Sequence, residues 1–169
     1  MKTLPIITDP KSPPKILKKV AKIINPRMND KPFTFFVYGK HFIILSESIW
    51  INKITGVAEH LFGQIEFPID VAHWVVAGIE DKFMKGPNEG GLPAGEFKNK
   101  QDVDGETLYL VRGVCVGGPT MPGYKLVNLS RKNKYNDYQE FAMGDDFLFD
   151  YGLLDCWKDL ADRHDRGEF

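Results

Sequence analysis

The sequence predicts a single α+β domain spanning residues 1–169, in which a mainly antiparallel sheet of about four to six strands packs against three to four helices. The length of 169 residues suits one hydrophobic core, because single domains are commonest at about 100–150 residues. Hydrophobic residues make up 43% of the chain and aromatic residues 12%, which is enough apolar surface to offset the entropy of ordering it. Helical hydrophobic periodicity and β-branched or aromatic runs both occur, and this mixture favours an α+β fold.

The first expected element is a basic amphipathic helix over about residues 13–25. Ser12 is a candidate N-cap, the two prolines after it are tolerated in a first helical turn, and Asn25-Pro26 ends the helix. The apolar residues follow the spacing of one helical face: Ile16, Leu17, Val20, Ile23 and Ile24. The other face carries Lys15, Lys18, Lys19 and Lys22. We expect these lysines to point to solvent and not to meet the acidic C-terminal helix.

Residues 33–62 predict a β-hairpin followed by a helix. Two β-branched and aromatic runs, residues 33–38 and 41–45, are separated by the spacer Gly39-Lys40, which can form a tight turn. Apolar side chains then recur with a helical period over residues 49–62, although a glycine in the middle weakens the pattern.

A longer helix is expected over about residues 68–85, where apolar residues repeat with a helical period between a proline at the start and Gly86-Pro87 at the end. The segment that follows, about residues 86–105, holds five glycines and two prolines with little periodicity. This composition predicts a mobile loop.

The remaining third of the chain predicts three strands and a final helix. The strands are expected at residues 106–117, 124–130 and 138–143, and we expect them to share one sheet with the first hairpin. An apolar stripe with a helical period then predicts a helix over about residues 153–164.

Several classes of protein are not indicated by the sequence. No apolar run approaches the length of a membrane-spanning helix, and the N-terminal residues lack a signal-peptide core, so we expect no membrane association and a cytoplasmic location. The two cysteines, Cys115 and Cys156, are expected to be reduced thiols. The four histidines are scattered, and His73 is expected to make only a local contact with Asp70. We therefore predict no cofactor and no metal site.

Charge is sorted to the two ends of the chain. Residues 1–27 hold seven Lys/Arg against one Asp, whereas residues 139–169 hold three Lys/Arg against nine Asp/Glu. The sequence shows no cofactor, metal or nucleophile motif. The charge asymmetry therefore favours a small non-enzymatic binding protein that recognises another macromolecule, and we expect that macromolecule to be a protein. Inhibitors, immunity proteins and regulators are of this kind, and a bacteriophage or mobile-element origin would fit a compact chain without familiar motifs.

Nucleic-acid binding is the first alternative. Residues 124–138 interleave basic side chains, which can contact phosphates, with tyrosines, which can stack on unpaired bases. Together with the lysines of residues 13–25, the candidate binding residues are Tyr124, Arg131, Lys132, Lys134, Tyr135 and Tyr138. The competing interpretation of this segment is a solvated strand pair joined by a polar turn.

An enzyme is the second alternative, with its site covered by the loop at residues 86–105. Such a site would use His41, His60 or His73 together with a nearby Asp or Glu in a pocket beneath that loop. The sequence contains no recognisable nucleophile motif, so no catalytic residue is assigned.

Overall fold

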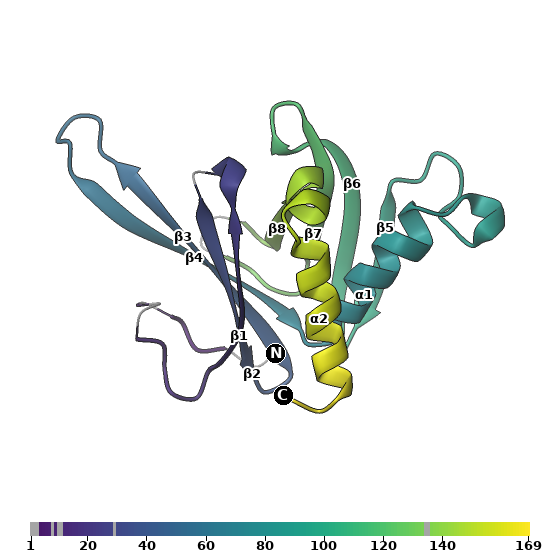
Figure 1. The fold of residues 1–169 in the computed structure, drawn as a ribbon, viewed down its shortest axis with the longest axis horizontal. Coiled ribbons are helices and arrows are strands. Elements are labelled where there is room, and N and C mark those ends of the chain that lie inside the picture. The colour runs from purple at the N-terminus through teal and green to yellow at the C-terminus, as the bar shows by residue number, and fades with distance from the viewer. Residues whose placement is uncertain (1–3, 8, 10–11, 29, 134–135) are drawn as a thin grey trace.

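The strands of the protein form two antiparallel sheets, each with its strands arranged in chain order (Figure 1). The computed structural model describes residues 4–7, 9, 12–28, 30–133 and 136–169. Over these residues the order of elements is the same in both halves: four strands joined as a meander, followed by a helix. The result is a single small domain made mainly of sheet, with few helical residues.

The first sheet contains β1 (Lys18–Asn25), β2 (Lys31–Tyr38), β3 (His41–Ile51) and β4 (Ala58–Pro68). A 3₁₀ turn, Pro26–Met28, follows β1. The expected hairpin at residues 33–45 is confirmed as β2 and β3, with Phe42 opposite Val37 and Ile44 opposite Phe35. Gly39 has a φ of 57° in the connecting turn, a conformation that glycine adopts without a steric penalty.

The second sheet contains β5 (Lys98–Val103), β6 (Glu106–Gly118), β7 (Met121–Asn128) and β8 (Gln139–Gly144). The three strands expected after residue 105 are thus confirmed, but they do not share a sheet with the first hairpin. The expected loop at residues 86–105 is correct only in part, since it contains the 3₁₀ turn Pro87–Glu89 and ends in β5.

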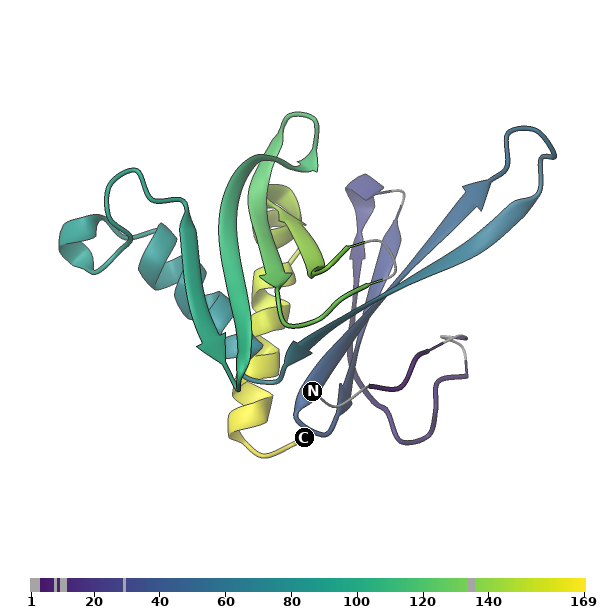
Figure 2. The ribbon, with the colours of Figure 1, turned by 180° about the vertical axis from the view of Figure 1, so that it is seen from behind.

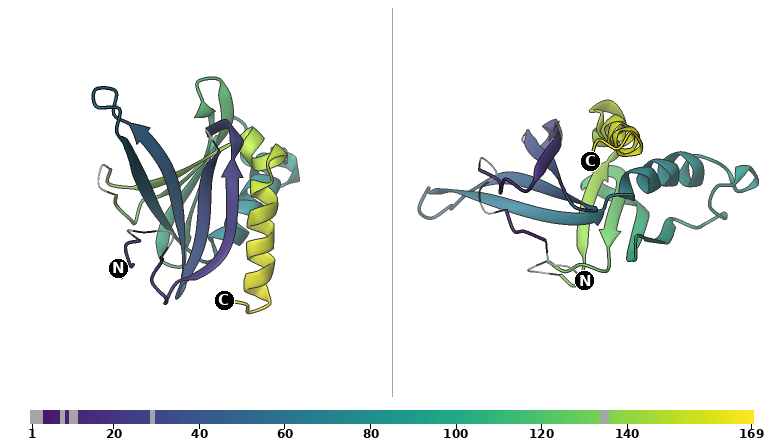
Figure 3. Two further views of the ribbon diagram at one scale, coloured as in Figure 1. Left: turned by 60° about the vertical axis from the view of Figure 1, so that its left-hand side comes forward. Right: turned by 90° about the horizontal axis from the view of Figure 1, so that it is seen from below.

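Two helices follow the two sheets. Helix α1 (Val71–Ala77) continues into a π-helical segment, Gly78–Phe83, and together they confirm the helix expected over residues 68–85. Helix α2 (Leu153–Asp165) confirms the final helix and follows a second π-helical segment, Asp146–Asp150. The views in Figures 2 and 3 show α2 lying along the interior side of both sheets, with α1 beside it. None of the helices in the described ranges is both long and apolar enough to span a bilayer.

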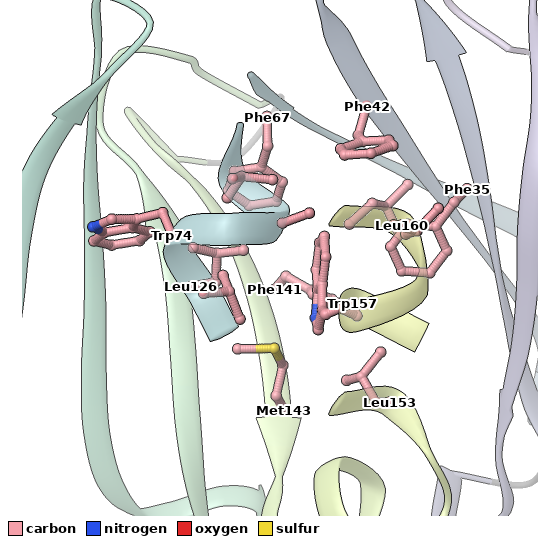
Figure 4. Packing of buried hydrophobic residues seen from close by; sticks show 14 of the residues in the cluster. Phe35, Phe42, Phe67, Trp74, Leu126, Phe141, Met143, Leu153, Trp157 and Leu160 are labelled. Atoms are coloured by element: carbon pink, nitrogen blue, oxygen red, sulfur yellow. The ribbon is translucent and has the colours of Figure 1, made fainter. Parts of the chain in front are cut away.

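The main core lies between the two sheets and is closed by α2. Trp157 of α2 is fully buried and makes edge-to-face contacts with Phe35 and Phe42 of the first sheet and with Phe141 of the second (Figure 4). Aromatic pairs in such geometry stabilise a core beyond the area they bury. A smaller apolar cluster covers the opposite face of the first sheet, where Leu4, Ile7 and Leu17 pack on Phe36, Ile43 and Leu45.

The helix expected over residues 13–25 is wrong, because Lys18–Asn25 is strand β1 and Lys15 lies in a turn before it. Residues 20–24 contain three β-branched side chains, which favour extended backbone, and β1 obtains its backbone hydrogen bonds by pairing with β2. Ala21 and Ile23 lie opposite Phe35 and Phe33 and pack against the main core. The apolar spacing that resembles a helical face is produced by a strand with a bulge between Lys19 and Ala21.

The helix expected over residues 49–62 is also wrong. These residues form the outer parts of β3 and β4 and the turn between them. Asn52 organises this turn, because its backbone N–H donates to the carbonyl of Val57 and its side-chain oxygen accepts from the N–H groups of Ile54 and Thr55. Gly56, which weakens the helical pattern, has a φ of 69° in the same turn.

Candidate functional site

The outer part of the β3–β4 hairpin projects from the body of the protein, as all of the ribbon views show (Figures 1, 2 and 3). We call residues 47–62 the arm. The first arm residue, Glu47, pairs with Phe62, and the last pair before the turn is Ile51 with Ala58. The pairing of β2 with β3 ends at the beginning of the arm, where Phe33 lies opposite Ser46. The arm is therefore a two-stranded ribbon without a neighbouring strand on either side among the described elements.

The arm exposes large apolar side chains on both of its faces. Residues directly opposite each other on antiparallel strands share a face, and successive residues alternate. One face carries Ile49, Ile51 and Phe62, and the other carries Trp50 and Leu61. Ile54 at the turn is 95% exposed, and Ile49 and Ile51 are 63% and 60% exposed.

These two faces continue the two buried faces of the same sheet. Phe42 and Ile44 of β3 belong to the main core. Every second residue further along the strand lies on the same face, which carries Trp50 in the arm. Ile43 and Leu45 belong to the smaller cluster on the other face, and Ile49 and Ile51 lie on that face in the arm. The arm thus has the apolar pattern of a doubly buried sheet, but it lies beyond the elements that cover that sheet.

A groove of about 380 Å³ lies at the base of the arm. It is lined by Met28, Asp30, Lys31, Pro32, Glu47, Ser48, Ile49 and His60. The groove follows the edge of β3 at the point where β2 no longer pairs with it. An unpaired strand edge offers N–H and C=O groups to an added strand, so this edge and the groove beside it suit pairing with an extended segment of another chain.

The lysines predicted from the sequence do not form one helical face. Lys15, Lys18, Lys19 and Lys22 are all exposed, but only the last three lie on β1. Lys18 Nζ donates to the backbone carbonyl of Glu168 at 2.5 Å, beyond the end of α2, so this contact does not pair a lysine with an acidic side chain of the helix. Arg163 of α2 also donates to the carbonyl of Val20 in β1, at 2.8 Å.

The basic and aromatic segment at residues 124–138 is divided between the surface and the interior. Tyr124 is 5% exposed on β7, between the Phe83 ring and the Arg112 guanidinium, and burial raises the pKa of its hydroxyl. Arg131 is 6% exposed. Neither residue is available to bind nucleic acid, so these two assignments are corrected. Lys132 and Tyr138 are exposed, and Lys132 pairs with Asp137 at 2.6 Å. Lys134 and Tyr135 lie outside the described residues.

Arg131 joins the two sheets through buried ion pairs. Its guanidinium lies 2.6 Å from Glu106 of β6 and 2.7 Å from Glu66 of β4. Asn128 donates to Glu106 and to the Glu66 carbonyl. Burial opposes ionisation of Glu106, but hydrogen bonds from His41, Arg131 and Asn128 outweigh it and lower the pKa of this carboxyl to about 2. These buried ion pairs and hydrogen bonds therefore link the first sheet to the second.

The three histidines of the enzyme alternative lie in three different surroundings. His41 Nε2 lies 3.0 Å from Glu106 Oε1, but both oxygens of that carboxylate also accept hydrogen bonds from Arg131. His60 lines the groove at the base of the arm. His73 lies on α1 beside Asp165 of α2. His41 and His73 thus each lie beside a carboxylate, but the groove that His60 lines contains no residue of the 86–105 segment among its described lining.

No family model, no curated protein and no solved structure matches the chain.

Sequence reasoning missed the arm because its apolar residues fit a helical period by chance. A local signal for the correct structure was present in residues 49–57, which contain five β-branched residues around an Asn-Lys-Ile-Thr-Gly turn. The exposure of the arm has no signal in the sequence, since it depends on where β2 and the N-terminal segment end.

Proposed function

We propose that this chain is a non-enzymatic protein-binding module and that the arm is its binding element. The observation that carries the proposal is an apolar pattern on both faces of a projecting two-stranded ribbon. Isolated hairpins are at best marginally stable in water, and exposed apolar patches on folded proteins commonly mark interaction sites. Trp50 and Phe62 are of the residue classes that are enriched at the centres of interfaces.

The proposed occupant is a different protein with an apolar cleft that covers both faces of the arm. A second copy of this chain is a poor match, because the groove at the base of the arm mixes charged Asp30, Lys31 and Glu47 with its apolar residues, whereas the tip of the arm carries Ile54 and Val57. The arm itself holds only Lys53 against Glu47 and Glu59, so its recognition would depend on apolar contacts more than on charge.

Site-specific photocrosslinking tests this proposal and separates it from the lysine surface predicted from the sequence. The photoreactive amino acid p-benzoylphenylalanine is placed at Ile54 in the arm, at Lys22 on β1 or at Tyr138 before β8. Each variant is produced in the native cell, irradiated and analysed by mass spectrometry. We expect a discrete adduct with another protein from position 54 and none from position 22 or 138, and we expect Trp50→Ser with Ile51→Ser to abolish the adduct.

Three outcomes would contradict the proposal. Adducts from position 22 but not 54 would move the interface to the lysines of β1, and nuclease-sensitive adducts from position 138 would favour the nucleic-acid alternative. Adducts from position 54 only with a second copy of this chain, together with a dimer mass in light scattering, would replace the foreign partner with self-association.

A further inference from the structure

A second cluster of polar side chains lies where the start of α1 meets the end of α2, on the opposite side of α1 from its buried face. His73 of α1 and His164 and Asp165 of α2 each offer a ligand atom, and these atoms lie within 4.8 Å of one another. His73 Nε2 is 3.0 Å from Asp165 Oδ1. The local contact expected between His73 and Asp70 is replaced by these contacts between the helices.

His164 Nδ1 and the Asp70 carboxylate lie 3.5 Å apart at this junction. Nδ1 of His164 is buried and has no hydrogen-bond partner in the part of the chain that the structure describes, although Oδ1 of Asp70 lies close to it. Asp70 occupies the N-cap position of α1, but its side chain makes no capping hydrogen bond. A carboxylate at an N-cap ordinarily accepts from the first backbone N–H groups of the helix. Here it lies close to the imidazole instead.

The spacing and chemistry of these groups match a transition-metal site. Two ligand atoms on a tetrahedral zinc ion with bonds of about 2.0–2.1 Å lie about 3.3 Å apart, which is close to the 3.0 Å between His73 and Asp165. We propose that His73, His164 and Asp165 bind a divalent transition-metal ion of the zinc class, with Asp70 orienting the His164 ring. Imidazole nitrogens favour such ions over Mg²⁺ and Ca²⁺, which prefer oxygen ligands.

The surroundings are compatible with a bound cation. Arg163 and Arg166, the two basic residues nearest to His164 in the sequence, form ion pairs with Glu168. The side chains of His73 and Asp165 are 41% and 65% exposed, so they can move by the ångström or so that contraction around an ion requires, and the fourth position is open to water. Because the ligands come from both helices, the ion would tie α1 to the last turn of α2.

The competing interpretation is a pair of histidine–aspartate contacts between helices with no affinity for metal. Calorimetric titration of the untagged protein with Zn²⁺, and thermal unfolding with and without the ion, separate the two. Every protein in the series carries Cys115→Ser, because that exposed thiol can bind zinc by itself. We expect one ion per chain and a higher Tm in the presence of Zn²⁺.

Four variants locate the site. His73→Gln or His164→Gln should lower zinc affinity by more than the roughly 10–100-fold that loss of an outer-shell partner causes, and Asp70→Asn should fall within that range. His60→Gln, at an exposed position in the arm, is the matched control and should bind as the parent does. Without metal all four should unfold within a few degrees of the parent, since exposed ion pairs contribute only about 0–1 kcal/mol.

Absence of zinc binding in the parent would overturn the proposal. Binding that survives both His73→Gln and His164→Gln, or that falls equally in His60→Gln, would also overturn it. None of these outcomes depends on the function proposed for the arm, since the arm crosslinks are read without added metal.

Discussion

Strands β3 and β4 are buried at one end and exposed at the other, although their composition changes little along their length. In the base of the hairpin, residues 42–45 are at most 1% exposed, and Phe67 opposite Phe42 is fully buried. In the arm, Ile49 and Ile51 are more than half exposed. The difference arises from the neighbours: α2 and the N-terminal segment pack on the base, and the pairing of β2 with β3 ends at Ser46, before the arm begins.

Burial along this one ribbon is therefore set by the elements that cover it and not by its own sequence pattern. The base is stabilised within the chain, whereas the arm keeps the same apolar alternation without a neighbouring strand among the described elements. Stability experiments should therefore distinguish base from arm, and the following three do so in decreasing order of expected effect.

The largest effect is expected at the base of β3. Phe42→Ala removes a fully buried ring that packs against Trp157 and Phe169, and it should lower the free energy of unfolding by about 3–5 kcal/mol. Trp50→Ala in the arm removes a larger side chain and serves as the control. Chemical denaturation monitored by circular dichroism measures both. Equal losses would show that the arm is packed as tightly as the base and would remove the contrast.

Lowering the pH should have an intermediate effect on stability, because it protonates Glu106 in the buried cluster with Arg131 and with Glu66 of β4. Glu106 has a pKa of about 2 in the folded protein and an ordinary pKa of 4.5. Because the folded pKa is the lower one, the stabilisation is complete above about pH 5 and is lost as the pH falls from about 4.5 to about 2. Its full size is on the order of 3 kcal/mol.

Glu106→Gln removes the titrating group and should flatten this part of the stability profile. The measurement is the free energy of unfolding of both proteins between about pH 6 and about pH 3. The difference between them should shrink toward the acidic end. Profiles that stay parallel would mean that Glu106 does not ionise with a lowered pKa in the folded protein.

The smallest effect is expected in the arm. Trp50→Ser and Ile51→Ser should each change the free energy of unfolding by less than about 0.5 kcal/mol, since 47% and 60% of these residues' surface is already exposed, and they should raise solubility. Ile44→Ser at the base is the matched control and should be strongly destabilising. A large loss from the arm substitutions would mean that the arm is covered within the chain in solution.

The elements that sequence patterns predicted correctly are those whose local signals agree. Residues 33–45 combine β-branched and aromatic runs with a two-residue turn, and α2 has an uninterrupted apolar stripe. Residues 16–24 and 49–62 carry conflicting signals, with helical spacing but many β-branched side chains. In both segments the pairing with a neighbouring strand decides the outcome.

The candidate sites were harder to predict because burial depends on tertiary packing. Arg131 stands in a polar run that resembles a surface turn, yet it extends inward to Glu66 and Glu106 from distant strands. The histidine cluster likewise joins residues about ninety positions apart, and only the packing of α1 on α2 brings them together. Sequence spacing therefore contained no signal for either cluster.

The junction of base and arm has a further mechanical consequence. Ser46 lies opposite Gly63, whose missing side chain leaves room for the Ser46 hydroxyl, which donates to the Gly63 carbonyl at 3.4 Å. Glycine inside a strand lowers its resistance to bending. Five arm residues at about 3.4 Å each give a lever about 17 Å long, so a bend of about 15° at this pair would displace the tip by about 4 Å. A small bend at Gly63 would thus move the tip by nearly the distance that separates neighbouring strands in a sheet.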